Sequence, residues 1–479
     1  MNTIQRIIKN VSLLFISQMI SYVFGFFALV YAARYLGVES FGILSLAIAF
    51  TGIFSVFMDM GLSTLTTREL ARKKSDTETY ISNITTIKLV LTLINLGLIF
   101  FIVQFLGYNQ QTITVIYLIL FYTIFNNFSI MFYAVFQANE KIEYQSLGVI
   151  ISSILLLIGV LVAIYYKFDI IQFSSIYTVT GFFVLVYVSF SYLYKYPSPK
   201  LKFNAQKWKF LIKESWPFAI TNMSTYIYTW IDTILLSILV GQEAVGLYNA
   251  SYKLVLVLMF IPVVFNTAIF PIMSKYYISS KESLNITFEK LFKIMVIAAI
   301  PIGIGTVIIA KKLIVLIYGT EFIGAVLALQ ILIWSIVLIF ARSPFERVLE
   351  ASNQQLLVTK LFLIGVIFNI ILNIIVIPKY SFIGAGIITV FTDALILGLI
   401  LILIKNFGIK ISTKIKKSLL KIVLASLVMG IVVYVFLDYN LFLLIIVGTI
   451  VYSAMLLILK ILDNDEIAMI KSIIKIKKI

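Results

Sequence analysis

The amino-acid sequence predicts an all-α integral membrane protein with about fourteen transmembrane helices. Of its 479 residues, 61% are hydrophobic and only 12% are charged, and the mean hydropathy is +1.07. Soluble globular domains are about 45–50% apolar and about 25% charged, so this chain lacks the polar surface that water requires. Its apolar residues are also gathered into runs of about 20, the length at which a helix rising 1.5 Å per residue crosses a hydrocarbon core.

Fourteen apolar runs have this length, and short polar segments separate them. The first run is longer than the apolar part of a cleaved signal peptide, so it is predicted to be a membrane helix. The spans are expected at about residues 11–33, 42–65, 82–106, 112–136, 146–166, 171–194, 215–240, 247–272, 291–309, 323–341, 356–377, 383–404, 419–437 and 441–460.

Lysine and arginine residues are distributed unequally between the two sides of the predicted membrane. With fourteen crossings, 31 of the 38 lie in the two tails and the six loops of one side, and five lie on the other side. Because positively charged segments stay on the cytoplasmic side, both termini are predicted to be cytoplasmic. The basic loops near 195–213 and 405–421, and the tail at 471–479, are expected to contact anionic lipid headgroups.

The composition also excludes several kinds of chemistry. Cysteine and histidine are both absent, which removes disulfides, Cys/His metal sites, and thiol or histidine nucleophiles. The sequence has no Gly-rich Lys motif for nucleoside triphosphates, so we expect no cofactor, no metal and no enzymatic activity. The net charge of +17 would indicate a nucleic-acid partner for a soluble protein. Here most of the basic residues lie in the segments between the predicted membrane spans, so no nucleic-acid partner is expected.

A short motif recurs in the two halves of the chain. Residues 37–42, between spans one and two, and residues 241–246, between spans seven and eight, share the pattern G-x-E-x-x-G at a separation of 204 residues. Such a repeat predicts two six-helix lobes, and six is an even number, so both lobes have the same orientation and bind substrate between them. The predicted domains are lobes at 1–204 and 205–410, followed by two additional helices and a basic cytoplasmic tail at 411–479.

Several further motifs stand out along the chain: ARYLGVESFG at 33–42, DMGL at 59–62, TRELAR at 67–72, IDT at 231–233, GLYNASYK at 246–253, and Asn373 with IPKY at 377–380 and GA at 384–385. Together they resemble those of the polysaccharide-biosynthesis flippases, the O-antigen (Wzx) type of the multidrug/oligosaccharidyl-lipid/polysaccharide superfamily. The resemblance covers most of residues 1–404. In contrast to related flippases, whose cavities often carry several arginines, the first span offers only Ser17 and Gln18.

The resemblance implies a function as well as a fold. It implies alternating-access transfer of a polyprenyl-(pyro)phosphate-linked oligosaccharide from the cytoplasmic to the outer leaflet. It also implies fourteen helices, since members with lipid-linked substrates carry two more helices than the twelve-helix drug exporters. Membrane lipids and other polysaccharide-assembly proteins are further candidate partners. The abundant isoleucine and lysine fit a prokaryotic genome, so the expected location is the cytoplasmic membrane of a prokaryote.

Charged residues within the spans are candidates for substrate binding or ion coupling, because a charge at the bilayer centre costs roughly 2.5–3.5 kcal/mol. Asp232 and Lys253 lie at similar depths on spans seven and eight. They are expected either to form a salt bridge or to bind a coupling cation and the substrate phosphate, respectively. Asp59 and Lys88 form a second possible pair, near the cytoplasmic ends of spans two and three.

Other charged candidates lie nearer the ends of spans. Arg34 ends span one on the outer side, and Arg342 ends span ten on the cytoplasmic side. Arg68 and Arg72 follow span two, where they either anchor the loop at headgroup level or meet substrate. Asp393 lies within span twelve without an obvious partner, so it is a candidate for a protonation or cation-linked site.

Three classes of function remain after these observations. A lipid-linked oligosaccharide flippase accounts for the charges, the repeat and the two extra helices. A cation-coupled multidrug exporter of the same superfamily is the alternative, and a membrane glycosyltransferase or polymerase is disfavoured because the outer loops are short. The tryptophans at 208, 216 and 230 are interpreted as markers of the membrane interface, with a sugar-binding platform as the alternative.

Overall fold

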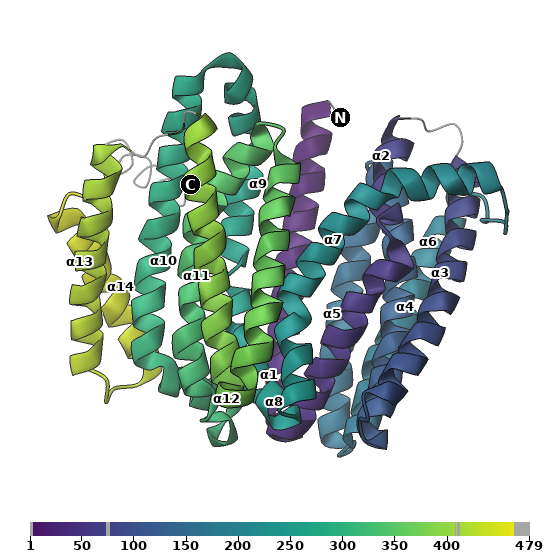
Figure 1. Ribbon diagram of the computed structural model, residues 1–479, viewed down its shortest axis with the longest axis horizontal. Coiled ribbons are helices and arrows are strands. Elements are labelled where there is room, and N and C mark those ends of the chain that lie inside the picture. Colours follow the sequence, from purple (N-terminus) through teal and green to yellow (C-terminus); the bar gives the residue numbers. More distant parts are fainter. Residues whose placement is uncertain (1–2, 73–76, 408, 410–411, 464–479) are drawn as a thin grey trace. The chain divides into compact units, whose positions relative to one another are not determined.

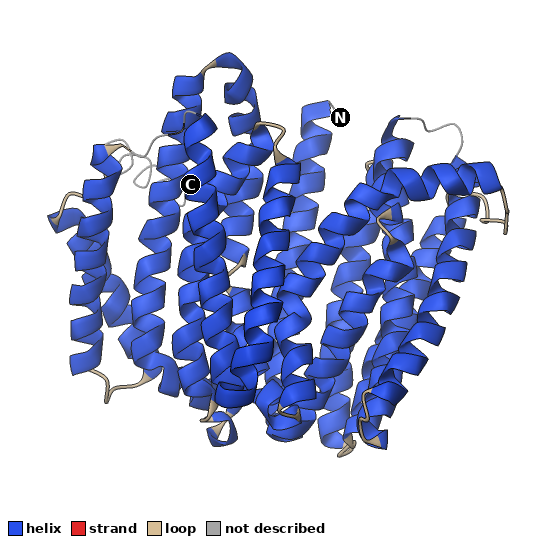
Figure 2. Cartoon of the chain, viewed as in Figure 1, coloured by secondary structure: helices blue, strands red, loops and turns tan. Residues whose placement is uncertain are grey.

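The computed structural model describes residues 3–72, 77–407, 409 and 412–463, and its regular structure is helical in all of them (Figures 1 and 2). The tail at 471–479, expected to contact lipid, lies outside the described residues. The helices are α1 (Thr3–Asp59), α2 (Leu62–Arg72), α3 (Thr77–Phe105), α4 (Gln110–Ala138), α5 (Ile142–Tyr165), α6 (Ile170–Leu193), α7 (Ala205–Leu239), α8 (Gln242–Val257), α9 (Phe260–Ser279), α10 (Lys281–Tyr318), α11 (Ala325–Ala351), α12 (Gln355–Leu403), α13 (Thr413–Val435) and α14 (Leu441–Ile458), with short 3-10 turns at Thr320–Phe322 and Ile404–Phe407.

The number of membrane crossings agrees with the sequence. Within the described residues, eleven helical stretches are long and apolar enough to cross a membrane, judged by length and composition. Two of them, α1 and α12, are each a pair of helices joined across one non-helical residue, Gly37 (φ 72°) and Ser381 (φ 51°). The polar α7 is not among the eleven, but its 35 residues extend about 50 Å, enough to cross. With these additions the crossing segments number fourteen, and the predicted all-α membrane fold is confirmed.

Polar side chains begin many of the helices. Asn109, Asp169, Asn204 and Asn440 each accept a hydrogen bond from the backbone N–H three residues later, at the starts of α4, α6, α7 and α14. Such caps satisfy N–H groups that have no partner within the helix. Polar side chains therefore help to fix where these four helices begin.

The helices are grouped into two compact units. Unit 1 comprises Met1–Asn249 and Asn373–Ser381, and unit 2 comprises Ala250–Leu372 and Phe382–Ile479. In unit 1, α1 packs against α4, α5 and α7, while α4 packs against α6. The predicted domain boundaries at 204 and 410 rest on the sequence repeat rather than on compactness, and they stay a prediction.

The two additional helices form a hairpin in unit 2. There α10 packs against α11 and α13, and α13 packs against α14 (Figure 1). Within unit 1, large apolar side chains on α3 face outward, with Leu93 68% and Phe101 70% exposed. A soluble protein rarely exposes such a run, whereas a bilayer solvates it.

The two copies of the repeated motif meet inside unit 1. A Cβ atom added to Gly42 would lie 1.9 Å from the carbonyl oxygen of Gln242, and one added to Gly246 would lie 2.1 Å from the carbonyl oxygen of Val38. Each glycine thus packs against the residue four positions before the other glycine. This reciprocal contact is what a two-fold relation between duplicated segments produces, so it supports the predicted repeat.

Candidate functional site

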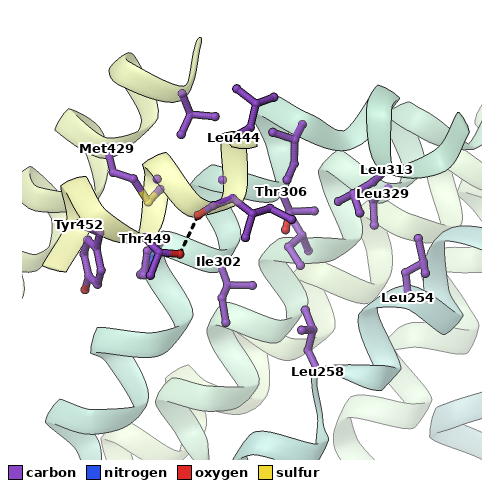
Figure 3. Close-up of a pocket in the computed structure, with 17 residues that line it drawn as sticks. Leu254, Leu258, Ile302, Thr306, Leu313, Leu329, Met429, Leu444, Thr449 and Tyr452 are labelled. Carbon is purple, nitrogen blue, oxygen red and sulfur yellow. Dashed lines mark hydrogen bonds between the residues drawn. The ribbon is translucent and has the colours of Figure 1, made fainter. Parts of the chain in front are cut away.

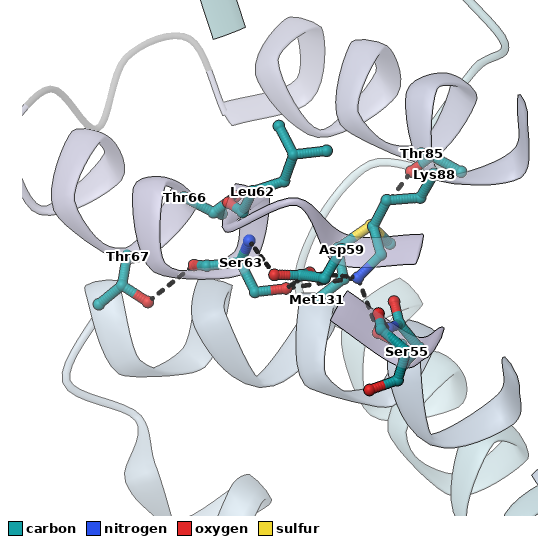
Figure 4. A network of polar contacts seen from close by, with 10 residues as sticks. Ser55, Asp59, Leu62, Ser63, Thr66, Thr67, Thr85, Lys88 and Met131 are labelled. Atoms are coloured by element: carbon teal, nitrogen blue, oxygen red, sulfur yellow. Dashed lines mark hydrogen bonds and ion pairs between the residues drawn. The ribbon is translucent and has the colours of Figure 1, made fainter. Parts of the chain in front are cut away.

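Asp59 and Lys88 form the centre of a polar network in unit 1 (Figure 4). The Lys88 ammonium lies 2.7 Å from Asp59 Oδ1 and donates to the hydroxyl of Ser63 (3.3 Å) and the carbonyl oxygen of Asn127 (2.9 Å). The Ser63 hydroxyl and backbone N–H both donate to the Asp59 carboxylate. The Lys88 side chain is fully buried, and its three donors all have acceptors. The structure therefore brings this candidate pair together as a neutral unit.

A break between α1 and α2 places Asp59 in this network. Met60 and Gly61 have φ values of 43° and 75°, a left-handed turn that ends α1 at Asp59 and starts α2 at Leu62. A Cβ atom on Gly61 would lie 2.6 Å from the carbonyl oxygen of Ser215. Glycine therefore allows both the turn and the close packing of α7 against it.

Two cavities open beside this network, both within unit 1. The first has a volume of about 310 Å³ and is lined by residues of α1, α2, α4 and α7, among them Asp59, Asn126 and Trp230. The second, of about 520 Å³, is lined by α2, α4 and neighbouring residues, among them Arg68. Ser63, Thr64 and Ile130 line both cavities, so the two are adjacent.

Arg68 is bound by two carboxylates. Its guanidinium lies 2.8 Å from Glu69 and 2.8 Å from Glu214 of α7, and it stacks over the ring of Phe218 at 5.6 Å. The hydrogen bond to Glu214 raises the pKa of Arg68, so the group stays charged. Arg72 is 67% exposed and lies 3.6 Å from Glu69. The positive charge of Arg68 is thus compensated within the protein.

Asp232 is buried in unit 1 with partners that the sequence did not single out for it. One carboxylate oxygen accepts from the Tyr248 hydroxyl and the other from the Asn373 amide, each at 2.7 Å. Asn373 therefore bonds across helices, as amide side chains within membrane spans often do. Lys253 lies in unit 2, and its pairing with Asp232 stays a prediction. The motif GLYNASYK at 246–253 is the sequence signal that could have identified Tyr248.

Asp393 lies in a second ionic cluster, in unit 2. Arg342 Nη1 lies 3.3 Å from Asp393 and its Nε lies 3.2 Å from Glu346, and the hydroxyl of Ser335 donates to Asp393. The guanidinium also lies over the ring of Phe362 at 4.8 Å. Asp393 had no obvious partner in the sequence, and the structure gives it Arg342 and Ser335. Span ten was predicted to end at 341, whereas α11 continues to Ala351, so Arg342 lies inside the helix at a depth of about 14 Å.

An apolar cavity of about 490 Å³ lies in unit 2, between residues of α8, α10, α11, α13 and α14 (Figure 3). Leu254, Ile302, Leu329 and Met429 are among its lining residues. The hydroxyl of Thr449, which also lines it, donates to the carbonyl oxygen of Ile445 in its own helix. The cavity therefore offers an apolar wall to which both additional helices contribute.

Arg34 completes the predicted candidates. It is exposed and lies three residues before the break at Gly37. Among the described residues, no group of three or more acidic side chains is placed to hold a metal ion.

The protein-family model described as "Polysaccharide biosynthesis protein" matches residues 7–277, more than half of the chain. The chain belongs to the polysaccharide biosynthesis protein family. The predicted resemblance is therefore confirmed at the level of this family. A second model, MatE, matches residues 217–375.

The chain is also similar to individual proteins and to a solved structure. Capsular polysaccharide biosynthesis protein CapF of Staphylococcus aureus is 25% identical over 386 residues, 79% of this chain and 94% of CapF. The probable flippase AglR of Haloferax volcanii is 29% identical over 182 residues, 37% of this chain and 38% of AglR. The chain thus aligns with little more than a third of AglR. The lipid II flippase MurJ, in an inward closed conformation, matches with a TM-score of 0.77 and 20% identity over 92% of this chain and 97% of MurJ, and it shares the fold.

Proposed function

We propose that this protein is a flippase that moves a polyprenyl-(pyro)phosphate-linked oligosaccharide from the cytoplasmic to the outer leaflet by alternating access. The observation that carries the proposal is the family match over residues 7–277, in a family whose description is polysaccharide biosynthesis. The apolar cavity formed with α13 and α14 supports a substrate with a lipid chain, because burying such a chain is favoured by about 25 cal/mol per Å² of apolar surface.

The orientation and location follow from the charge distribution. Both termini are proposed to be cytoplasmic, because 31 of the 38 basic residues lie on that side of the predicted topology. The membrane is proposed to be the cytoplasmic membrane of a prokaryote, where enzymes that assemble polysaccharides are the natural partners. No catalytic activity is proposed, because the chain lacks cysteine and histidine and one of its relatives is the probable flippase AglR.

The candidate site residues take different roles in this proposal. Asp232, Asp393 and Lys253 remain candidates for ion coupling or phosphate contact. Asp59 and Lys88 compensate each other at 2.7 Å, which favours a positioning role beside the polar cavity. Arg68 is proposed to hold α2 to α7 through Glu214.

A cation-coupled multidrug exporter is the second candidate, because the MatE model matches residues 217–375. The two additional helices argue against it. An exporter of cations would also be expected to present an uncompensated carboxylate to its substrate.

A leaflet-specific glycan assay in a deletion strain tests the proposed function. Without the protein, lipid-linked glycans should accumulate on the cytoplasmic leaflet, out of reach of a glycan-binding probe added outside the cells. Normal display of these glycans on the outer leaflet, in a strain with no second transporter for them, would refute the flippase proposal.

A further inference from the structure

The cavity of about 310 Å³ in unit 1 has several properties of a ligand site. Its volume lies at the lower end of the range of about 300–1000 Å³ for small-molecule pockets. Its walls come from four helices, α1, α2, α4 and α7, and all of them belong to the same compact unit. The site is therefore a property of one rigidly packed part of the chain.

Polar side chains line this cavity at membrane depth. Asn126 is exposed and lies 12 residues from the end of α4, about 18 Å along the helix. An exposed amide at that depth is unfavourable against lipid, so it requires a polar space. Asn222 and the hydroxyls of Ser55, Thr64 and Thr123 line the same space. These groups supply both donors and acceptors of hydrogen bonds.

The cavity carries no net charge. Asp59 is its one ionisable acidic or basic lining residue, and its carboxylate is already bound by the buried ammonium of Lys88 at 2.7 Å. A free cation would meet no uncompensated carboxylate there, and a phosphate would meet no uncompensated cation. The lining therefore favours a neutral ligand with many hydroxyl groups.

Aromatic rings form one wall of the cavity. Tyr226 and Trp230 lie one helical turn apart on α7, and Tyr122 contributes from α4. The indole of Trp230 lies 3.6 Å from the position that a Cβ atom on Gly52 would occupy, so the small residue leaves the space beside the ring open. A flat ring beside amides and hydroxyls offers an apolar surface for ring C–H groups and polar partners for the hydroxyls around them.

From these features we infer that this cavity binds a neutral sugar residue of the transported glycan, with Trp230 as the stacking surface and Asn126 as a hydrogen-bonding partner. The inference rests on the proposed function and adds a recognition site for the glycan part of the substrate. It also replaces the interpretation of Trp230 as an interface marker. The phosphate and the lipid chain of the substrate bind elsewhere, because the cavity is neutral and polar.

Fluorescence of Trp230 tests the inference in the full-length protein. The chain has four tryptophans, and Trp208→Phe, Trp216→Phe and Trp334→Phe leave Trp230 as the single reporter. The probes are the oligosaccharide released by mild acid from the lipid-linked pool of the source cells, and tetraphenylphosphonium as a lipophilic cation. We expect a saturable change of emission with the oligosaccharide and none with the cation.

Two variants with a matched control locate the binding. Gly52→Leu fills the space beside Trp230 and Asn126→Ala removes an exposed amide, and each should weaken oligosaccharide binding by about tenfold, a loss of about 1.4 kcal/mol. The control is Gly97→Leu on α3, where an added Cβ has no atom within 4 Å, and binding should be unchanged. Absence of a saturable response to the oligosaccharide, full binding by both variants, or a response to the cation alone would overturn the inference.

The leaflet assay separates this inference from the proposed function. If the wild-type protein translocates lipid-linked glycan but Trp230 does not respond to the oligosaccharide, the sugar site is wrong and the flippase function stands. If the oligosaccharide binds but no translocation occurs, the site stands and the proposed function fails.

Discussion

The Lys88 ammonium has three acceptors and no exposed side-chain surface. Removing one partner of a buried ion pair leaves a charge without compensation, which costs more than the pair itself contributes. The same reasoning applies to Arg342, whose guanidinium is 4% exposed and faces two carboxylates and an aromatic ring. At both places the buried cation is stabilised by the carboxylates beside it, so removing either partner is expected to destabilise the fold.

We predict that Lys88→Met lowers the free energy of unfolding by about 3–5 kcal/mol, because the Asp59 carboxylate, only 16% exposed, loses the cation that compensates its charge. The double variant Asp59→Asn/Lys88→Met should recover most of this loss. Thermal unfolding of the purified protein in detergent measures both. The control is Lys200→Met, since this lysine is 72% exposed and 4.0 Å from Glu78, and an effect below about 1 kcal/mol is expected. Equal effects at Lys88 and Lys200 would refute the compensated pair.

We predict that Arg342→Lys destabilises the protein by about 1–3 kcal/mol, because an ammonium cannot reach Asp393 and Glu346 with the forked geometry of a guanidinium. Arg72→Lys is the matched control, because its guanidinium is 67% exposed, and no measurable change is expected. Urea unfolding of the two variants compares them directly. If Arg342→Lys leaves the free energy of unfolding unchanged, the cluster does not need the guanidinium.

Some of these contacts could be predicted from the sequence, and others could not. Asp59 and Lys88 were predictable because both lie near the same ends of adjacent spans. The contact between Arg342 and Asp393 was missed, because hydropathy ends the span at the first charged residue while the helix itself continues to Ala351. Hydropathy measures the cost of a lone charge, so it cannot recognise a charge whose partner comes from a distant helix.

The sequence predicts individual helices more clearly than it predicts single contacts between side chains. The crossings were predictable from apolar length, and polar caps such as Asp169 confirm where helices begin. The breaks within α1 and α12 differ in how far the sequence predicts them. Gly37 has a positive φ that glycine favours, whereas Ser381 adopts a positive φ with no signal in its residue type.

At the level of helix packing, the reciprocal contact of residues 42 and 246 makes a direct prediction. Gly42→Ala and Gly246→Ala should each destabilise the protein by about 1–3 kcal/mol, because the new Cβ overlaps a backbone carbonyl oxygen. The double variant should cost less than the sum, since one separation of the two segments relieves both overlaps. Gly97→Ala on α3 meets no atom within 4 Å and should be neutral or slightly stabilising. Thermal unfolding distinguishes these outcomes, and an unchanged Gly42→Ala would contradict the close packing.

For the whole molecule, the absence of cysteine makes the topology directly testable. A single introduced cysteine is the only thiol that a maleimide can label. We predict that Gln110→Cys, exposed at the start of α4, reacts with a membrane-impermeant maleimide in intact cells. Ser198→Cys, exposed in the basic segment between α6 and α7, should react only after permeabilisation. The reverse pattern would invert the proposed orientation.

Each of the two units, taken by itself, holds a cavity, and the two cavities differ in their lining. Unit 2 holds an apolar cavity of about 490 Å³ that includes both additional helices, and unit 1 holds a polar, neutral cavity of about 310 Å³. Taken by itself, the cavity of unit 2 suits a lipid chain and the cavity of unit 1 suits a neutral polar group, and the proposed substrate contains both kinds of group. The family match over residues 7–277 remains the basis of the flippase proposal.

Reconstitution of the purified protein with lipid-linked oligosaccharide in sealed vesicles tests this proposal most directly. A membrane-impermeant oxidant that cleaves the glycan is added outside, with an ion gradient and a membrane potential imposed. We predict that vesicles containing the protein lose glycan from both leaflets, while protein-free vesicles lose only the outer-leaflet fraction. If oxidation stops at the outer-leaflet fraction in both preparations, the protein does not translocate lipid-linked oligosaccharide and the central claim is wrong.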